Sequence, residues 1–152
     1  MTEKKNLAAS VRQRLLNLSR ERNEPFTDTL LRFAVERLLY RLSQSPYSKR
    51  FLLKGSLLIS LWNNNLPHRP TRDMDLHGIG SNELADLESV FRSLAALPVA
   101  DDGLTFDPDS VQTKRINETK AYAGARVRLL AHLANAQIPV QVDIGFGDVI
   151  TP

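Results

Sequence analysis

The chain has 152 residues, of which 42% are hydrophobic and 24% are charged, a composition typical of a soluble globular domain. It contains no cysteine, which excludes a disulfide scaffold, a thiolate metal site and a cysteine nucleophile. No apolar run approaches the roughly 20 residues that cross a bilayer, and the first residues lack the apolar centre of a secretory signal. We therefore expect a cytoplasmic protein with no membrane partner.

Charge is distributed unevenly along the chain. Residues 1–50 carry 11 lysines and arginines against 5 aspartates and glutamates, whereas residues 51–152 carry 9 against 12. A basic region attracts phosphate backbones, and clustered carboxylates hold divalent cations. The sequence leaves open a second interpretation, in which these charges only solvate a helical surface.

Apolar spacing predicts the secondary structure in chain order. Steps of three and four residues indicate helices over 7–20 and 27–42, which Glu24-Pro25 separates. The same reasoning predicts further helices over 57–63 and 82–97, and a turn-rich segment over 98–110. Alternation of apolar and polar residues predicts the strands, at 51–53, 73–77, 113–116, 125–133 and 138–146, the last two joined through 135–137.

This order of elements predicts an α+β (mixed α/β) fold, a mixed sheet flanked by helices. We expect residues 1–50 to form an N-terminal helical segment packed on the core, and residues 51–152 to form the core itself.

Three carboxylates have a pattern that suits metal binding. Asp73 and Asp75 alternate with the apolar Met74 and Leu76, so they share one face of a strand. Asp143 lies in an apolar strand, and if the two strands are neighbours, all three carboxylates converge. Close carboxylates repel one another unless a cation neutralises them, and oxygen ligands select Mg²⁺ or Mn²⁺.

The Asp-x-Asp spacing is weak evidence by itself. Asp107-Pro108-Asp109 has the same spacing, but its proline and acidic neighbours indicate a turn. Solvated aspartates at a strand end remain the alternative for Asp73 and Asp75. Arg126 and Arg128 also alternate with apolar residues, and for them a solvated sheet face is favoured over contact with phosphates.

A second motif, Lys54-Gly55-Ser56, precedes the aspartate pair. Glycine lets the chain approach a phosphate closely, and serine at a helix start offers its hydroxyl beside free backbone N–H groups. Lys54 adds positive charge. The alternative is an ordinary turn with a serine cap.

In combination these motifs resemble the AbiEii/AbiGii-type nucleotidyltransferase toxins of type IV toxin–antitoxin systems, within the DNA polymerase β-like nucleotidyltransferase superfamily. The resemblance rests on the Lys54-Gly55-Ser56 turn, the run RPTRDMD from Arg69 to Asp75, and the run VQVDIGFGD from Val140 to Asp148. It extends from about Phe51 to the end of the chain.

The resemblance implies a metal-dependent transfer of a nucleoside monophosphate from a nucleoside triphosphate to a hydroxyl, often an RNA 3′ end and particularly that of tRNA. Asp73, Asp75 and Asp143 are then the catalytic and metal-binding residues. Lys54, Gly55, Ser56 and Arg72 are then the nucleotide-binding residues. A cognate antitoxin is an implied partner, and the basic helices could receive the RNA.

Members of the family continue into a further helical region that contributes a lysine and an aspartate, and we expect this chain to lack it. A catalytically silent module that binds RNA or an antitoxin is therefore an alternative. A metal-dependent phosphohydrolase that uses the same carboxylates is a third possibility.

Overall fold

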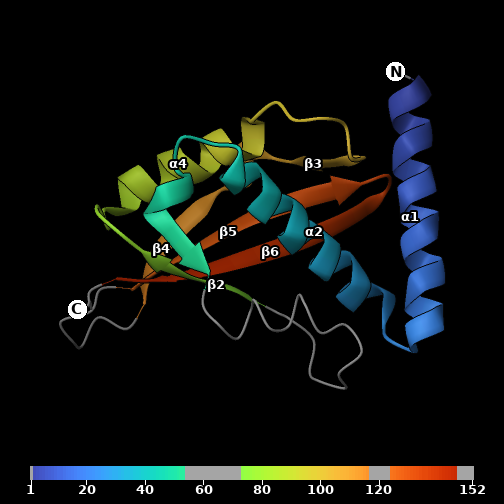
Figure 1. The fold of residues 1–152 in the computed structure, drawn as a ribbon, viewed down its shortest axis with the longest axis horizontal. Coiled ribbons are helices and arrows are strands. Elements are labelled where there is room, and N and C mark those ends of the chain that lie inside the picture. The colour runs from blue at the N-terminus through green and yellow to red at the C-terminus, as the bar shows by residue number, and fades with distance from the viewer. Residues whose placement is uncertain (1, 54–72, 117–123, 147–152) are drawn as a thin grey trace.

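The computed structural model describes residues 2–53, 73–116 and 124–146, and it has the predicted α+β architecture (Figure 1). Its helices are α1 (Thr2–Arg22), α2 (Phe26–Ser43) and α4 (Leu84–Ala96), with short 3₁₀ turns at Ser48–Arg50 and Pro108–Ser110. Its strands are β1 (Phe51–Leu53), β2 (Asp73–Gly78), β3 (Leu104–Phe106), β4 (Gln112–Ile116), β5 (Gly124–Leu133) and β6 (Ala136–Gly145). The helix expected at 57–63 lies outside the described residues.

The strands form one mixed sheet in the order β1-β2-β6-β5-β3, and β4 also pairs with β5. The β2–β6 pair is parallel, whereas β1–β2, β5–β6, β3–β5 and β4–β5 are antiparallel. The long β5–β6 hairpin therefore occupies the middle of the sheet, and its last strand lies beside β2.

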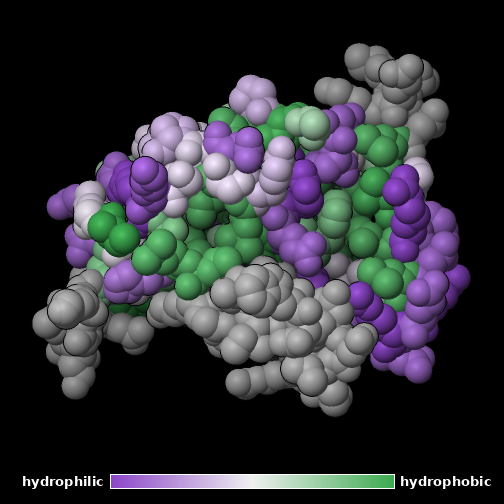
Figure 2. All heavy atoms as spheres, viewed as in Figure 1, coloured by the Kyte–Doolittle hydropathy of each residue, from purple (hydrophilic) through white to green (hydrophobic). Residues whose placement is uncertain are grey.

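Helices α2 and α4 cover one face of this sheet. The residues of that face are buried because every second residue of each strand is apolar, as Met74, Val127 and Val142 illustrate. Phe91 of α4 packs edge-on against Phe51 of β1, with ring centroids 5.8 Å apart. Figure 2 shows hydrophobic atoms gathered at the centre of this helix-covered side, with hydrophilic atoms toward the rim and along α1.

Helix α1 lies beyond the β5–β6 turn, at one end of the sheet (Figure 1). It comes close to Gly103, where an added Cβ would lie 3.2 Å from the Cα of Ala8. Gly103 also has a φ of +83°, a conformation that favours glycine. Asp143 is about seven residues along β6 from this turn, so the turn, beside which α1 lies, is about 23 Å from Asp143.

Two details of the sequence-based prediction are wrong. The segment 98–110 contains strand β3, whose three residues pair with the end of β5. The hairpin turns at Ala134 and Asn135, because β5 ends at Leu133 and β6 begins at Ala136, so the expected connection at 135–137 is displaced. Ala134 has a φ of 53°, which closes this tight turn.

Candidate active site

Asp75 and Asp143 are direct partners in the parallel pairing of β2 with β6. Adjacent strands lie about 4.8 Å apart, and registered residues of parallel strands point to the same face. The neighbours of these aspartates, Met74 and Val142, are buried on the opposite face. Both aspartates are only half-buried, so two carboxylates lie on the face of the sheet that α2 and α4 do not cover.

The other predicted site residues are described in part or not at all. Asp73 precedes Asp75 by two residues in β2, and its backbone is registered with Gln141. Lys54, Gly55, Ser56 and Arg72 lie outside the described residues. Their grouping with the aspartates therefore stays a prediction.

Arg126 is a member of the site that sequence reasoning did not place there. It is registered opposite Asp143 in the β5–β6 hairpin. Its Nε donates to Oδ1 of Asp143 at 2.8 Å and its Nη2 donates to Oδ2 at 3.1 Å. This bidentate geometry is the strong form of an arginine–carboxylate contact, so Arg126 pairs with Asp143 and is not simply solvated on the sheet face.

We call the face of the sheet that α2 and α4 do not cover the open face. On it, registered residues form a row across four strands. Asp75 of β2 is followed by Asp143 of β6, Arg126 of β5 and Lys114 of β4, each registered with the next. A parallel row contains Gln141, Arg128 and Gln112, and Nε of Arg128 donates to Oε1 of Gln141 at 2.9 Å. In the first row the carboxylates lie on β2 and β6 and the cations on β5 and β4, whereas the second row has one cation, Arg128, between two glutamines.

A cleft of about 490 Å³ opens at the β4 end of these rows. Lys114, Arg126 and Arg128 line it together with Gln112, Thr113 and Glu88. Strand β4 pairs with β5 alone among the described strands, so the cleft lies at an edge of the sheet. A second cleft, of about 740 Å³, lies between α1 and the β5–β6 turn and is lined mainly by apolar atoms.

The donor set suits a hard divalent cation. Asp75 and Asp143 supply carboxylate oxygens, the ligands that Mg²⁺ and Mn²⁺ prefer. Among the described side chains no group of three potential ligands is found. Arg126 holds both oxygens of Asp143, so a cation would have to compete with this guanidinium for at least one of them.

The mixed sheet, with two carboxylates registered on one face, defines an α+β protein with a candidate site for a divalent cation. The family model described as "Nucleotidyl transferase AbiEii toxin, Type IV TA system" matches residues 37–152. The chain therefore belongs to this family, and it is a nucleotidyltransferase of the AbiEii toxin class, as the resemblance predicted.

The search of curated proteins finds no match to this chain. The family match begins within α2, so α1 precedes the matched region. No helix in the described ranges is both long enough and apolar enough to span a membrane.

Proposed function

We propose that the protein transfers a nucleoside monophosphate from a nucleoside triphosphate to the 3′ hydroxyl of an RNA such as tRNA, as a toxin opposed by a cognate antitoxin. The observation that carries this proposal is the direct registration of Asp75 with Asp143 on the open face. Membership of the AbiEii family supports the reaction class.

In this proposal Asp73, Asp75 and Asp143 hold Mg²⁺ or Mn²⁺. When bound, such ions stabilise charge on the attacking and leaving oxygens of an in-line displacement. Two carboxylates at the spacing of neighbouring strands would otherwise repel each other, and Arg126 relieves that repulsion at Asp143. The guanidinium therefore orients the carboxylate until the substrates arrive.

Asp143 is the proposed base. The acceptor oxygen forms a bond to the α-phosphorus, the bond to the pyrophosphate oxygen breaks, and a carboxylate oxygen of Asp143 takes the hydroxyl proton. Lys54, Gly55, Ser56 and Arg72 are proposed to hold the β- and γ-phosphates. Backbone N–H groups and cations there would offset the charge that develops on pyrophosphate.

A catalytically silent module that binds RNA or an antitoxin is the second candidate. The observation that favours it is the bidentate contact of Arg126, which occupies both oxygens of Asp143. The two candidates differ in whether a divalent cation and a triphosphate displace this contact.

The test is transfer of α-³²P label from each of the four nucleoside triphosphates to total RNA in the presence of Mg²⁺. We expect label in RNA with at least one nucleotide, and loss of at least about 100-fold in Asp143→Asn. Asp109→Asn is the matched control, because Asp109 belongs to an exposed Asp-x-Asp turn. Labelled free monophosphate without labelled RNA indicates a phosphohydrolase, and no product with any nucleotide indicates the silent module.

A further inference from the structure

We infer that the acceptor strand binds on the open face of the sheet, along a cationic strip formed by Lys114, Arg126 and Arg128 with Gln112. This inference rests on the proposed function, and it assigns the RNA to a surface different from the basic N-terminal helices. The strip belongs to β4 and β5, which lie within the region that the family model matches.

The strip lies close to the carboxylates of the site. Lys114 is registered with Arg126, and Arg126 with Asp143, so the Cα of Lys114 lies about 10 Å from that of Asp143. Arg128 follows Arg126 by two residues on the same face of β5. A strand bound along these residues would present its terminal hydroxyl to the carboxylates with its preceding phosphates on the strip.

The strip also presents exposed positive charge. Lys114 and Arg128 are exposed, and no ion pair of either residue is found in the described part of the chain. The cleft that they line has a volume of about 490 Å³, which gives a phosphate and its sugar room to enter. Exposed cations without an ion pair, close to the carboxylates of the site, suit a phosphate backbone that must end at those carboxylates.

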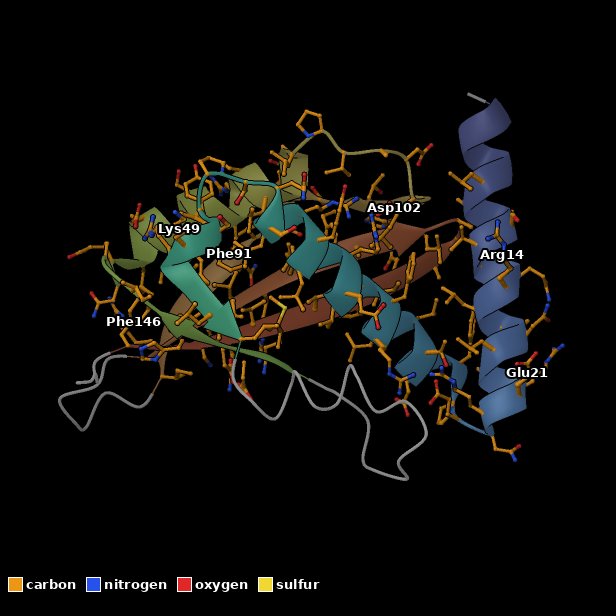
Figure 3. All side chains as sticks on the ribbon, viewed as in Figure 1. Arg14, Glu21, Lys49, Phe91, Asp102 and Phe146 are labelled. Atoms are coloured by element: carbon orange, nitrogen blue, oxygen red, sulfur yellow. The ribbon has the colours of Figure 1, made fainter. Side chains whose placement is uncertain are left out.

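The N-terminal helices provide less free charge than their sequence suggests. Four arginines of residues 1–50 form ion pairs within the protein: Arg32 with Glu24, Arg37 and Arg41 with Asp102, and Arg50 with Asp86. Arg12 lies over the ring of Phe26 at 5.2 Å from its centroid. Exposed cations remain on α1, such as Arg14 in Figure 3, but α1 is at the far end of the β5–β6 hairpin from Asp143.

The test is fluorescence anisotropy of a labelled single-stranded RNA of 12 nucleotides with the whole protein in EDTA, so that neither metal nor catalysis is needed. We expect the double variant Lys114→Glu/Arg128→Glu to raise the Kd at least about tenfold. The milder Lys114→Gln/Arg128→Gln should lower the slope of log K against log salt by about 1.4, or about 0.7 for each lost phosphate contact.

Two control variants define the alternative surfaces. Arg14→Glu/Arg20→Glu reverses exposed charge on α1, and Lys49→Glu reverses an exposed charge near β1. Both should change the Kd less than about twofold, beyond the general effect of net charge. Circular dichroism melting of every variant checks that the fold is intact.

An unchanged Kd in both strip variants overturns the inference, as does a greater loss in Arg14→Glu/Arg20→Glu than in the strip. Absence of RNA binding by the wild-type protein overturns it too, whereas label transfer to a short acceptor would then still support the proposed reaction. RNA binding that depends on the strip without label transfer supports the strip and rejects the proposed reaction.

Discussion

Arg126 and Asp143 face each other across the β5–β6 hairpin and share two hydrogen bonds, of 2.8 and 3.1 Å. The guanidinium thus occupies the two oxygens that the proposed divalent cation would use. Because the Asp143 side chain is 19% exposed and that of Arg126 is 26% exposed, the pair is open to exchange with ions from solution. Arg126 therefore orients the carboxylate of Asp143 and also competes with a divalent cation for its oxygens.

Arg126→Ala should therefore raise the affinity for Mn²⁺ several-fold, because it removes the guanidinium that pairs with Asp143 beside Asp75. Electron paramagnetic resonance titration of free Mn²⁺ measures this affinity directly. Arg128→Ala is the matched control and its effect should be small, since Arg128 donates to Gln141 and no ion pair of Arg128 is found among the described residues. Unchanged or weaker Mn²⁺ binding in Arg126→Ala would contradict the competition.

Asp102→Asn should destabilise the fold by about 3 kcal/mol. Asp102 accepts hydrogen bonds from Arg37 and Arg41, and Arg41 is only 4% exposed, so the substitution leaves a buried guanidinium without its counter-charge. Figure 3 shows Asp102 in the segment that leads into β3. Urea unfolding measures the loss, and Asp101→Asn, at an exposed neighbour that caps Gly103, should cost less than about 1 kcal/mol.

The free energy of unfolding should also depend on pH through Asp102 and its arginine partners, Arg37 and Arg41. Burial by itself would raise the pKa of Asp102, but hydrogen bonds from Arg41 and Arg37 outweigh it and hold this pKa below its ordinary value. The pKa of Glu24 is lowered in the same way, because hydrogen bonds from Arg32 and Thr29 outweigh burial.

For a carboxylate with a lowered pKa, the stabilisation is complete above the unfolded pKa, near 4, and is lost as pH falls through the folded pKa. The urea midpoint should therefore be flat from pH 7 to about 5 and fall steeply below about 4. Asp102→Asn should show a shallower fall. An equally steep fall in this variant would mean that the cluster does not contribute to acid unfolding.

Gly78→Ala should destabilise the end of β2 by about 1–3 kcal/mol. An added Cβ would lie 2.4 Å from Cε1 of Phe146 and 2.8 Å from Cγ2 of Ile144, and Phe146 is itself buried. Thermal unfolding measures this cost. Phe146→Leu should recover part of the loss in the double variant, and additive effects of the two substitutions would show that the contact does not limit Gly78.

Periodicity predicted most of the described fold because the strands alternate and the helices are amphipathic. Strand β3 was missed because its three residues lie among turn formers, and tertiary contacts stabilise it. Leu104 pairs with Leu133, and its carbonyl oxygen accepts a hydrogen bond from Nη2 of Arg41. These partners are about 30 and 60 residues away in sequence, so local pattern could not indicate them.

The carboxylates of the site could be predicted, but their environment could not. Alternation placed Asp75 and Asp143 on polar faces, whereas their direct pairing depends on the parallel register of β2 and β6. Arg126 was missed for a more specific reason. A connection at 135–137 places the apolar Leu129 opposite Asp143, and only the turn at Ala134 and Asn135 places Arg126 there.

We propose that Asp75 and Asp143 together hold a catalytic divalent cation, which Mn²⁺ titration with a non-hydrolysable nucleoside triphosphate present can test. We expect Asp75→Asn and Asp143→Asn each to weaken Mn²⁺ binding at least about tenfold, while Asp109→Asn binds as the wild type does. Wild-type affinity in both site variants would show that these carboxylates do not hold the cation.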